Sequence, residues 1–279
     1  MSKLTADMVL AKIRQLPSLP AVVLELLASL DDEDADTEVL ARKISQDQGL
    51  VVKTLRVANS SFYGLQGQVE TIQDALVVLG FRQLRTLVVA ASVNARIPGA
   101  EQDPALNRAF WQHGLLVGLC ARQLAGACGR NAEGAFTAGL LHDLGRMALG
   151  GCFAAEYREV EVYRKAQDCY ALEAEAAVLG IDHAAVGGAL AERWNLPLSL
   201  RQAIALHHAP QESADPAAAL IHVADVMAHA LDMTHVVDDL VPRLNATAWN
   251  QLGLDWSRFK SCLLQVENQG RDLSAFSIG

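Results

Sequence analysis

The sequence GLLHDLGRMAL, from Gly139 to Leu149, decides how the rest of the chain is interpreted. Its leucines and Met147 recur at the spacing of one apolar stripe of a helix, and the adjacent pair His142 and Asp143 lies in the middle of this stripe. An imidazole beside a carboxylate, on a helix that should be mostly buried, has two explanations. It is either a satisfied polar pocket in a core or one half of a metal site.

The remainder of the chain also has the periodicity of helices. Apolar residues recur at three and four positions, and Val, Ile and Thr do not gather in alternating runs. We therefore predict an all-α protein, a multi-helix bundle without strands. The predicted helices cover residues 4–15, 19–30, 36–47, 49–59, 72–79, 82–95, 105–128, 133–148, 153–167, 172–179, 183–194, 198–208, 217–233 and 255–268.

Several of these helix ends have a chemical cause. The two prolines of Leu16–Pro20 interrupt the first helical pattern, because proline lacks an N–H and restricts the residue before it. Thr71 and Asp74 have the spacing of a capping box, and Gly80 fits the end of the helix that they begin. Asp182 is predicted to cap the helix that follows it.

Composition limits the function classes. The 279 residues contain no uncharged stretch of the roughly 20 residues that a membrane span needs, and the charged N-terminus does not resemble a secretory signal. Five cysteines without a C-x-x-C pair suggest a reducing cytoplasm, with neither disulfides nor a thiolate zinc site. A net charge of −9 argues against binding to a nucleic-acid backbone. We expect a soluble, cytoplasmic protein that binds neither membrane nor nucleic acid.

Seven imidazole and carboxylate side chains lie on different predicted helices among apolar neighbours, so a helix bundle could direct them at one interior point. They are His113, His142, Asp143, His183, His207, His208 and Asp225. Nitrogen and oxygen donors without thiolate favour Fe, Mn, Zn or Ni over a structural cysteine-type zinc. The predicted cofactors are accordingly one or two divalent metal ions.

Asp143 is the natural residue to bridge two such ions, because a carboxylate has two oxygens. The side chains of the adjacent residues His142 and Asp143 would point about 100° apart on one helix, and the first ion would lie between them. This ion would take four ligands: His113, His142, Asp143 and Asp225. The second ion would share Asp143 and take the remaining imidazoles: His183, His207 and His208. Two ions roughly 3.5–4 Å apart are a common device for hydrolysing a phosphoester.

Each of these residues also has an ordinary structural explanation. A lone helical histidine such as His113 is more often a hydrogen-bonded core or surface residue, and a His-His pair near a helix end can simply interact with the helix dipole. His222 and His229, on either side of Asp225, are interpreted as structural, and His235 carries no signal. It is the ordered set that favours a metal site.

The order His…His-Asp…His…His-His…Asp resembles the HD superfamily of metal-dependent phosphohydrolases, including the HD-GYP phosphodiesterases of cyclic di-GMP. The rest of the chain resembles a more particular relative, the HDOD (HD-related output domain) family. The resemblance covers roughly residues 14–230. It is carried by LPSLPAVVLELLASL (16–30), ISQDQGLVVKTLRVANSSFYG (44–64), IQDALVVLGFRQLRTLVVA (72–90), GLLHDLGRMAL (139–149), DHAAVGGALAERWNLP (182–197) and ALHHAP (205–210).

This resemblance implies a fold and a role. The fold would be an HD-like helical lobe, residues 101–235, packed on an N-terminal helical lobe, residues 1–100, with a C-terminal helical extension at 236–279. The role would be bacterial signal transduction. All seven residues of the constellation match the HD-GYP ligand pattern, which implies the same metal ligands.

The sequence departs from the HD-GYP pattern in three places. The catalytic lysine expected after the His-Asp pair is Arg146 here, and arginine is not an equivalent proton donor. The Gly-Tyr-Pro motif expected after the His-His pair is missing. The position four before His113, where some trinuclear relatives place a carboxylate, is Ala109, which argues against a third ion.

Two functions stay open at this point. The first, which we favour, is a non-enzymatic output module that binds signalling proteins, with any ion as a structural clip. The second is a di-metal phosphohydrolase acting on a cyclic dinucleotide, a nucleotide or another phosphoester. In that case Asp143 and Arg146 would be its catalytic residues, and a nucleotide or cyclic dinucleotide would be its ligand. The missing Gly-Tyr-Pro and lysine favour the first function, and the complete ligand set favours the second.

Overall fold

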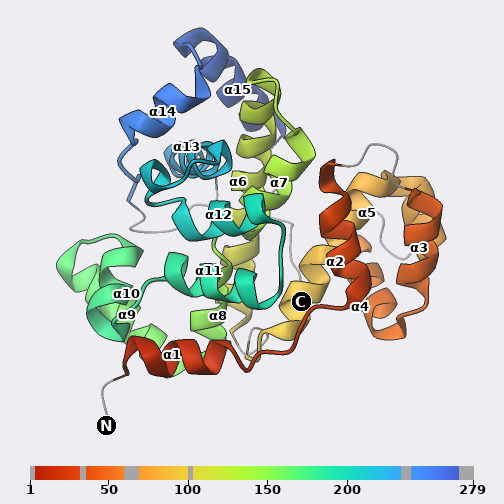
Figure 1. Ribbon diagram of the computed structural model, residues 1–279, viewed down its shortest axis with the longest axis horizontal. Coiled ribbons are helices and arrows are strands. Elements are labelled where there is room, and N and C mark those ends of the chain that lie inside the picture. Colours follow the sequence, from red (N-terminus) through yellow and green to blue (C-terminus); the bar gives the residue numbers. More distant parts are fainter. Residues whose placement is uncertain (1–3, 32–35, 60–68, 100–102, 234–239, 270–279) are drawn as a thin grey trace.

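The computed structural model describes residues 4–31, 36–59, 69–99, 103–233 and 240–269. Every regular element in these ranges is helical, so the predicted all-α class is confirmed. Figure 1 shows two groups of helices side by side. The smaller group comprises α2 (Ala21–Ala28), α3 (Thr37–Ser45), α4 (Gln48–Ala58) and α5 (Ile72–Arg96).

The larger group surrounds the long helix α6. Its members are α6 (Pro104–Ala127), α7 (Ala132–Leu141), α8 (Leu144–Cys152), α9 (Ala154–Gln167), α10 (Ala171–Leu179), α11 (His183–Arg193), α12 (Leu198–Leu206) and α13 (Pro216–Leu231). Two helices, α14 (Ala246–Leu252) and α15 (Trp256–Gln269), follow α13 and pack near it and α6. We did not predict α14.

Helix α1 (Ala6–Ile13) packs against α11 of the larger group, although the chain then continues into α2 of the smaller one. The connection between them is held by two side chains at the C-terminal end of α11. The Trp194 indole donates a hydrogen bond to the carbonyl of Pro17 (3.0 Å), and the Arg193 guanidinium donates one to the carbonyl of Arg14 (3.2 Å). The division between segments 1–100 and 101–235 stays a prediction.

Helix α5 begins with the predicted capping box. Thr71 Oγ accepts a hydrogen bond from the Asp74 N–H, and the Asp74 carboxylate accepts one from the Thr71 N–H. Gly80 then takes a non-helical conformation (φ 78°, ψ 164°), which divides α5 where the sequence predicted a break.

Helix α5 is long and apolar enough to cross a membrane, and so is the bent pair α10 and α11 if the two are counted as one span. Core helices of soluble proteins pass the same test. The break at Gly80 leaves about 24 Å of continuous helix after it, less than the roughly 30 Å of a bilayer core. The residues from Leu84 to Val93 are buried in the protein, so we interpret this part of α5 as a core helix.

The predicted helix 133–148 was wrong in one informative respect. The chain forms two helices there, since α7 ends at Leu141 and α8 begins at Leu144. His142 keeps helical angles, and Asp143 (φ −89°, ψ 18°) turns the chain as the N-cap residue of α8. The sequence has no proline at this break, and no glycine near it has a positive φ. Hydrophobic periodicity alone therefore predicted one continuous helix.

Glycines allow α8 and α11 to approach each other closely. A Cβ atom on Gly145 would overlap the carbonyl oxygen of His183 and lie 2.7 Å from the backbone nitrogen of Gly187. Both neighbours are backbone atoms, so the contact cannot relax by a side-chain rotation. This close approach fixes the distance between the start of α8, beside Asp143, and the start of α11 at His183.

We therefore expect Gly145→Ala to lower the free energy of unfolding by about 2 kcal/mol or more, because overpacking a tight contact typically costs about 1–3 kcal/mol. The matched control is Gly126→Ala, near the end of α6, where a Cβ would meet nothing within 4 Å. Replacing that helical glycine should stabilise the protein by about 0.5–1 kcal/mol. Urea unfolding measures both changes, and equal effects at the two positions would contradict the packing.

Candidate metal centre

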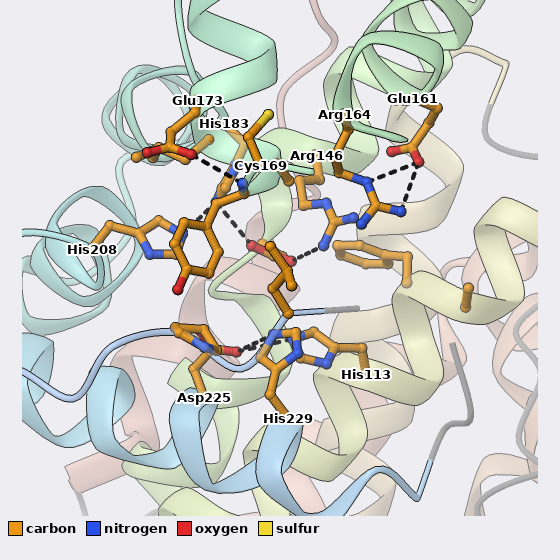
Figure 2. A pocket seen from close by; sticks show the side chains of 18 of the residues that line it. His113, Arg146, Glu161, Arg164, Cys169, Glu173, His183, His208, Asp225 and His229 are labelled. Atoms are coloured by element: carbon orange, nitrogen blue, oxygen red, sulfur yellow. Dashed lines mark hydrogen bonds and ion pairs between the residues drawn. The ribbon is translucent and has the colours of Figure 1, made fainter. Parts of the chain in front are cut away.

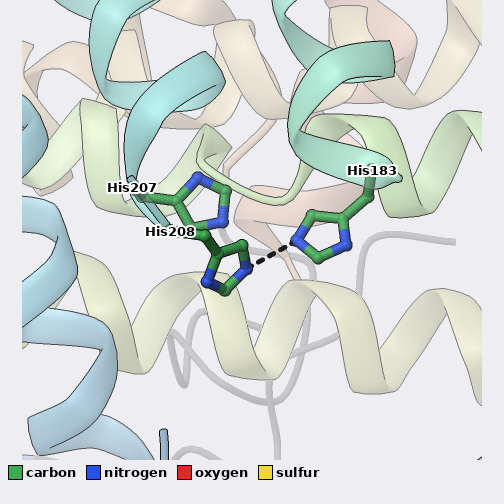
Figure 3. A group of neighbouring side chains, drawn as sticks. All are labelled: His183, His207 and His208. Atoms are coloured by element: carbon green, nitrogen blue, oxygen red, sulfur yellow. Dashed lines mark hydrogen bonds between the residues drawn. The ribbon is translucent and has the colours of Figure 1, made fainter. Parts of the chain in front are cut away.

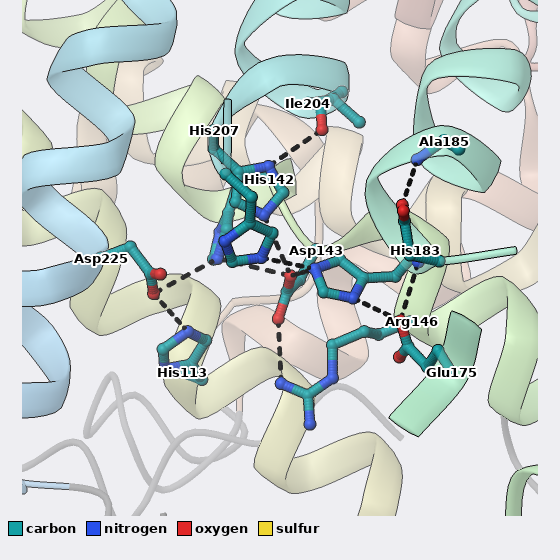
Figure 4. Close-up of polar contacts among 12 residues, drawn as sticks. His113, His142, Asp143, Arg146, Glu175, His183, Ala185, Ile204, His207 and Asp225 are labelled. Carbon is teal, nitrogen blue, oxygen red and sulfur yellow. Dashed lines mark hydrogen bonds and ion pairs between the residues drawn. The ribbon is translucent and has the colours of Figure 1, made fainter. Parts of the chain in front are cut away.

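The seven residues singled out from the sequence meet in the interior of the larger helix group; Figure 4 labels six of them, and Figure 3 labels the seventh, His208. They come from five parts of the fold: α6, the junction between α7 and α8, the first residue of α11, the two residues after α12, and α13. All are buried except His208, which is half-buried. The predicted helix 198–208 was too long, since α12 ends at Leu206 and leaves the His-His pair beyond its last turn.

One half of the centre lies around Asp143 Oδ1. Its distance to the Nε2 atom is 3.3 Å for His183, 3.6 Å for His142 and 3.7 Å for His207. His208 joins this half through His183, because their Nε2 atoms lie 2.9 Å apart (Figure 3). Three imidazoles thus direct Nε2 at the same carboxylate oxygen, and the fourth, that of His208, directs its Nε2 at His183.

The other half lies around Asp225 Oδ1. Its distance to the Nε2 atom is 3.1 Å for His113, 3.3 Å for His229 and 3.7 Å for His142. Our interpretation of His229 as structural therefore missed a residue of this centre. The available signal was its position four residues after Asp225 on one helix, which places both side chains on the same face.

Hydrogen bonds to the backbone fix the tautomers of two imidazoles. His142 donates its Nδ1–H to the carbonyl of Gly139 (2.7 Å), and His207 donates its Nδ1–H to the carbonyl of Ile204 (2.9 Å). A neutral imidazole that donates through Nδ1 keeps a lone pair on Nε2, and both Nε2 atoms face the interior. Nε2 of His207 is fully buried and has no hydrogen-bond partner among the residues that the structure describes. A buried nitrogen lone pair that no donor satisfies is suited to bind a metal ion.

His183 and Asp143 are held by a chain of buried polar contacts. Glu175 accepts hydrogen bonds from the His183 Nδ1–H (2.6 Å), the His183 backbone N–H (2.8 Å) and the Tyr157 hydroxyl (3.1 Å). Arg146 donates to the Tyr157 oxygen (3.3 Å) and to Asp143 Oδ2 (3.1 Å). We had not singled out Glu175. A carboxylate that holds the outer nitrogen of a metal-binding histidine is the usual second partner of such ligands.

Burial and these contacts lower the pKa values of three of the imidazoles and raise that of His183. Burial lowers the pKa of His142 and that of His207, and it lowers the pKa of His208 to about 3 with help from nearby His183. Burial alone would also lower the pKa of His183, but the carboxylates of Glu175 and Asp143 outweigh it and raise the value to about 9. At neutral pH, His183 therefore carries the charge and the other three imidazoles are neutral.

The same imidazoles keep the carboxylates ionised. Burial would raise the pKa of Asp143, but His142, His183 and Arg146 outweigh it and hold the value well below the usual range. Burial would likewise raise the pKa of Asp225, yet its hydrogen bonds hold it well below the usual range. Two ionised carboxylates beside neutral, inward-facing imidazoles are a donor set that suits a divalent cation of the Fe, Mn, Zn or Ni type.

His222 is structural, as predicted. Its Nδ1–H donates to the carbonyl of His207 (2.8 Å), and its Nε2 accepts from the backbone N–H of Asn245 (2.9 Å). Both ring nitrogens are thus used to join α13, the end of α12 and the start of α14. His235 lies outside the described residues.

A cavity of about 330 Å³ opens beside the centre (Figure 2). Candidate ligands from both halves line it: His113, Asp143, His183, His208, Asp225 and His229. Arg146 and Arg164 line it as well, and Arg164 is paired with Glu161 (3.2 Å). A small molecule inside the cavity would reach either half of the centre.

Comparison with known proteins places this geometry in a family. The HDOD domain family matches residues 16–210. A solved structure from Shewanella amazonensis SB2B, named "Putative phosphohydrolase", is 28% identical, with 97% of each chain covered and a TM-score of 0.68. An HDOD domain protein with unknown function from Geobacter sulfurreducens is 24% identical, with 96% of this chain and 97% of that chain covered and a TM-score of 0.73.

A third structure, from Marinobacter aquaeolei VT8, is named "Putative signal transduction protein". It is 21% identical with a TM-score of 0.77, and the match covers 98% of this chain and 60% of that one. A curated protein of Treponema pallidum (strain Nichols), named "Uncharacterized protein", is 26% identical over 207 residues, 72% of this chain; the match spans only 40% of that protein's length. Since the family match covers more than half of the chain, this protein belongs to the HDOD domain family and has its HD-related, all-helical fold.

Proposed function

We propose that this HDOD protein is a signal-transduction output module that holds divalent cations in its His/Asp centre and acts by binding other proteins. One observation carries the proposal. All seven side chains predicted to ligate a cation are present and lie close together. Arg146, by contrast, takes the position of the proton donor in hydrolytic relatives, and its guanidinium is already hydrogen-bonded to Asp143 and Tyr157.

The donor set supports the cation. In the described part of the chain, Nε2 of His207 is buried without a hydrogen-bond partner, and His142 is held in the same tautomer, which directs its Nε2 inward. A cation bound to this nitrogen would remove the free-energy cost of burying an acceptor without a partner. A bound cation would supply Lewis acidity to the cavity and would tie together the helices from which its ligands come.

The role of Arg146 argues against efficient hydrolysis. A leaving phosphoester oxygen needs a proton, and general acid catalysis is typically worth about 10²–10⁴ in rate. A guanidinium cannot supply that proton near neutral pH. Tyr157 is no better, because burial and Glu175 raise the pKa of its hydroxyl, which donates to Glu175 instead.

Exposed apolar residues in the smaller helix group support protein binding. Val52 on α4 and Val77 and Val78 on the first part of α5 are 60%, 77% and 53% exposed. These helices contact each other, so the three valines lie on one helix pair. Exposed apolar side chains of this size are a feature of many interaction sites.

A metal-dependent phosphohydrolase is the second candidate. The cavity favours it, because an ion bound by Asp143 or Asp225 would face enclosed space beside Arg146 and Arg164. Arginine is well suited to bind phosphate. The relative from Shewanella amazonensis named as a phosphohydrolase lends this candidate further support. A nucleotide or cyclic dinucleotide could also occupy the cavity as a regulatory ligand without being hydrolysed.

We predict that chelator-stripped protein binds Mn²⁺ or Zn²⁺ more tightly as the pH rises from 6.5 to 8.5, by up to about tenfold per pH unit. His183 has a pKa of about 9, so below that value a cation must displace its proton, while His207 and His208 are already neutral. The rise should level off above about pH 9. Isothermal titration calorimetry across this range measures the slope.

Two variants and a control make this test specific. Asp143→Asn and His183→Ala should bind at least tenfold more weakly, because each removes a ligand from the same half of the centre. Asp168→Asn is the matched control, since Asp168 is exposed at the end of α9 and tolerates asparagine in its left-handed conformation. Undetectable binding by the wild-type protein at every pH would contradict the proposal.

For turnover, we expect metal-loaded protein to hydrolyse cyclic di-GMP, mononucleotides and a generic phosphodiester at well below about 1 s⁻¹, the low end of ordinary enzymes. The physical reason is the missing proton donor at Arg146. Release of phosphate or nitrophenol measures the rate, with Asp143→Asn as the control for contaminating activity. Turnover above about 1 s⁻¹ that disappears in Asp143→Asn would establish the second candidate instead.

A further inference from the structure

A second cavity lies between the two helix groups and shares no lining residue with the His/Asp centre. Its volume is about 740 Å³. Small-molecule sites usually measure roughly 300–1,000 Å³ and occur preferentially between structural units. One wall is formed by α2 of the smaller group, and the other by α7, α12 and the first turns of α13 in the larger group (Figure 1). Both its size and its place therefore suit a small ligand.

The walls of this cavity are mainly aliphatic. Most of the apolar lining is supplied by Leu24, Leu27, Leu196, Leu198, Leu220 and Ile221. Leu198 is 59% exposed, so part of this apolar surface is left open to an occupant. None of the described residues in the lining is aromatic, so a nucleobase would find no ring on which to stack. An aliphatic chain is accordingly a better occupant than a nucleotide.

Positive charge lies beside these aliphatic walls. Arg201 lines the cavity, and its Nε is fully buried without a hydrogen-bond partner among the described residues. Arg130 adds a second guanidinium, which is exposed. A buried donor without an acceptor costs free energy, and an oxygen of a bound anion would remove that cost.

Helix α12 begins at the wall of the same cavity. Its N-cap residue is Pro197, which makes no side-chain hydrogen bond to the N–H groups of the first turn. Helical side chains lean toward the N-terminus, and Arg201 lies three residues after Leu198 on the same helix, so its guanidinium leans back toward that turn. The positive end of the helix dipole thus adds to the charge of Arg201.

The two acidic residues among the described lining are each engaged. Glu25 forms an ion pair with Lys43 of α3. The Asp215 carboxylate accepts a hydrogen bond from the Ala217 N–H (2.8 Å) at the start of α13. A cation offsets the first negative charge and a helix N-terminus the second. Charge complementarity in this cavity therefore favours an anion at the beginning of α12.

We infer that this cavity binds a small amphipathic carboxylate, with its aliphatic chain against the leucine walls and its carboxylate at Arg201 and the first turn of α12. The inference does not rest on the proposed cation binding, since no candidate metal ligand lines the cavity. Its position nevertheless bears on the centre, because α7 is followed by His142, α12 is followed by His207, and α13 carries Asp225. The ligand would contact these three helices and α2 at once.

Octanoate and decanoate are the probes, and isothermal titration calorimetry measures their binding. The protein is kept in EDTA, so that the carboxylate cannot bind an ion at the His/Asp centre. Decanoate should bind about tenfold more tightly than octanoate, because two more methylenes are buried. Acetate should not bind detectably, since it has no chain to bury.

Two variants locate the ligand. Arg201→Gln should weaken octanoate at least about tenfold, the loss expected for one charge-assisted hydrogen bond. It should leave the weaker binding of 1-octanol, the neutral counterpart, unchanged. Ala28→Phe should abolish binding of both compounds, because Ala28 is an exposed small residue of the lining, and a phenyl ring there would fill the cavity.

The matched control is Arg158→Gln, an exposed arginine on α9 that lines neither cavity, and it should bind octanoate like the wild type. Thermal unfolding without ligand checks that each variant is folded. Unchanged octanoate binding by folded Arg201→Gln or Ala28→Phe would overturn the site, and equal affinities of the wild type for octanoate and 1-octanol would overturn its preference for an anion. No binding of decanoate by the wild type up to about 1 mM would also overturn the inference and would leave the proposed cation binding untouched.

Discussion

Burying several charged groups at one point is the constraint on which this structure depends. An unpaired buried carboxylate is costly, and a buried charge pair is tolerated only when its remaining hydrogen-bonding atoms are satisfied. The chain Asp143–Arg146–Tyr157–Glu175–His183 meets that requirement, because each member bonds the next. These residues come from the start of α8, from α9 and α10, and from the start of α11; Figure 4 labels all of them except Tyr157. Their mutual satisfaction therefore fixes how four helices pack, and the glycine contact between α8 and α11 makes that packing close enough.

A cation would extend this arrangement to the remaining helices. Its candidate ligands add α6, the end of α12 and α13 to the elements already joined, so ion binding and helix packing are thermodynamically coupled. A ligand that binds only the folded state at 100 times its dissociation constant adds about 2.7 kcal/mol of stability. An output module could use that coupling as a clip, since loss of the ion would loosen several helices at once. The cavity beside the centre is lined by residues of the same elements.

The candidate ligands could be predicted from the sequence more fully than the helix boundaries and the supporting residues around them. His113, His183 and Asp225 could be predicted because residue type and apolar neighbours are local signals. The junction at His142 and Asp143 could not, since the apolar stripe continues through it and only tertiary packing breaks the helix. Glu175 reaches His183 through the left-handed turn at Gly180, a long-range consequence of the bend between α10 and α11. Its signal was a carboxylate on the apolar stretch ALEAEAAVL, beside an equally plausible capping glutamate.

The most direct test of the account is anomalous X-ray diffraction at the metal absorption edge, from crystals of protein loaded with Zn²⁺ or Co²⁺. The account predicts an anomalous peak about 2.0–2.3 Å from His183 Nε2 and Asp143 Oδ1, with Arg146 still bonded to the other oxygen of Asp143. It would be contradicted by loaded crystals that show no peak among these side chains, with His183 Nε2 and His208 Nε2 still hydrogen-bonded to each other. In that case the histidines and aspartates would be a hydrogen-bonded core alone.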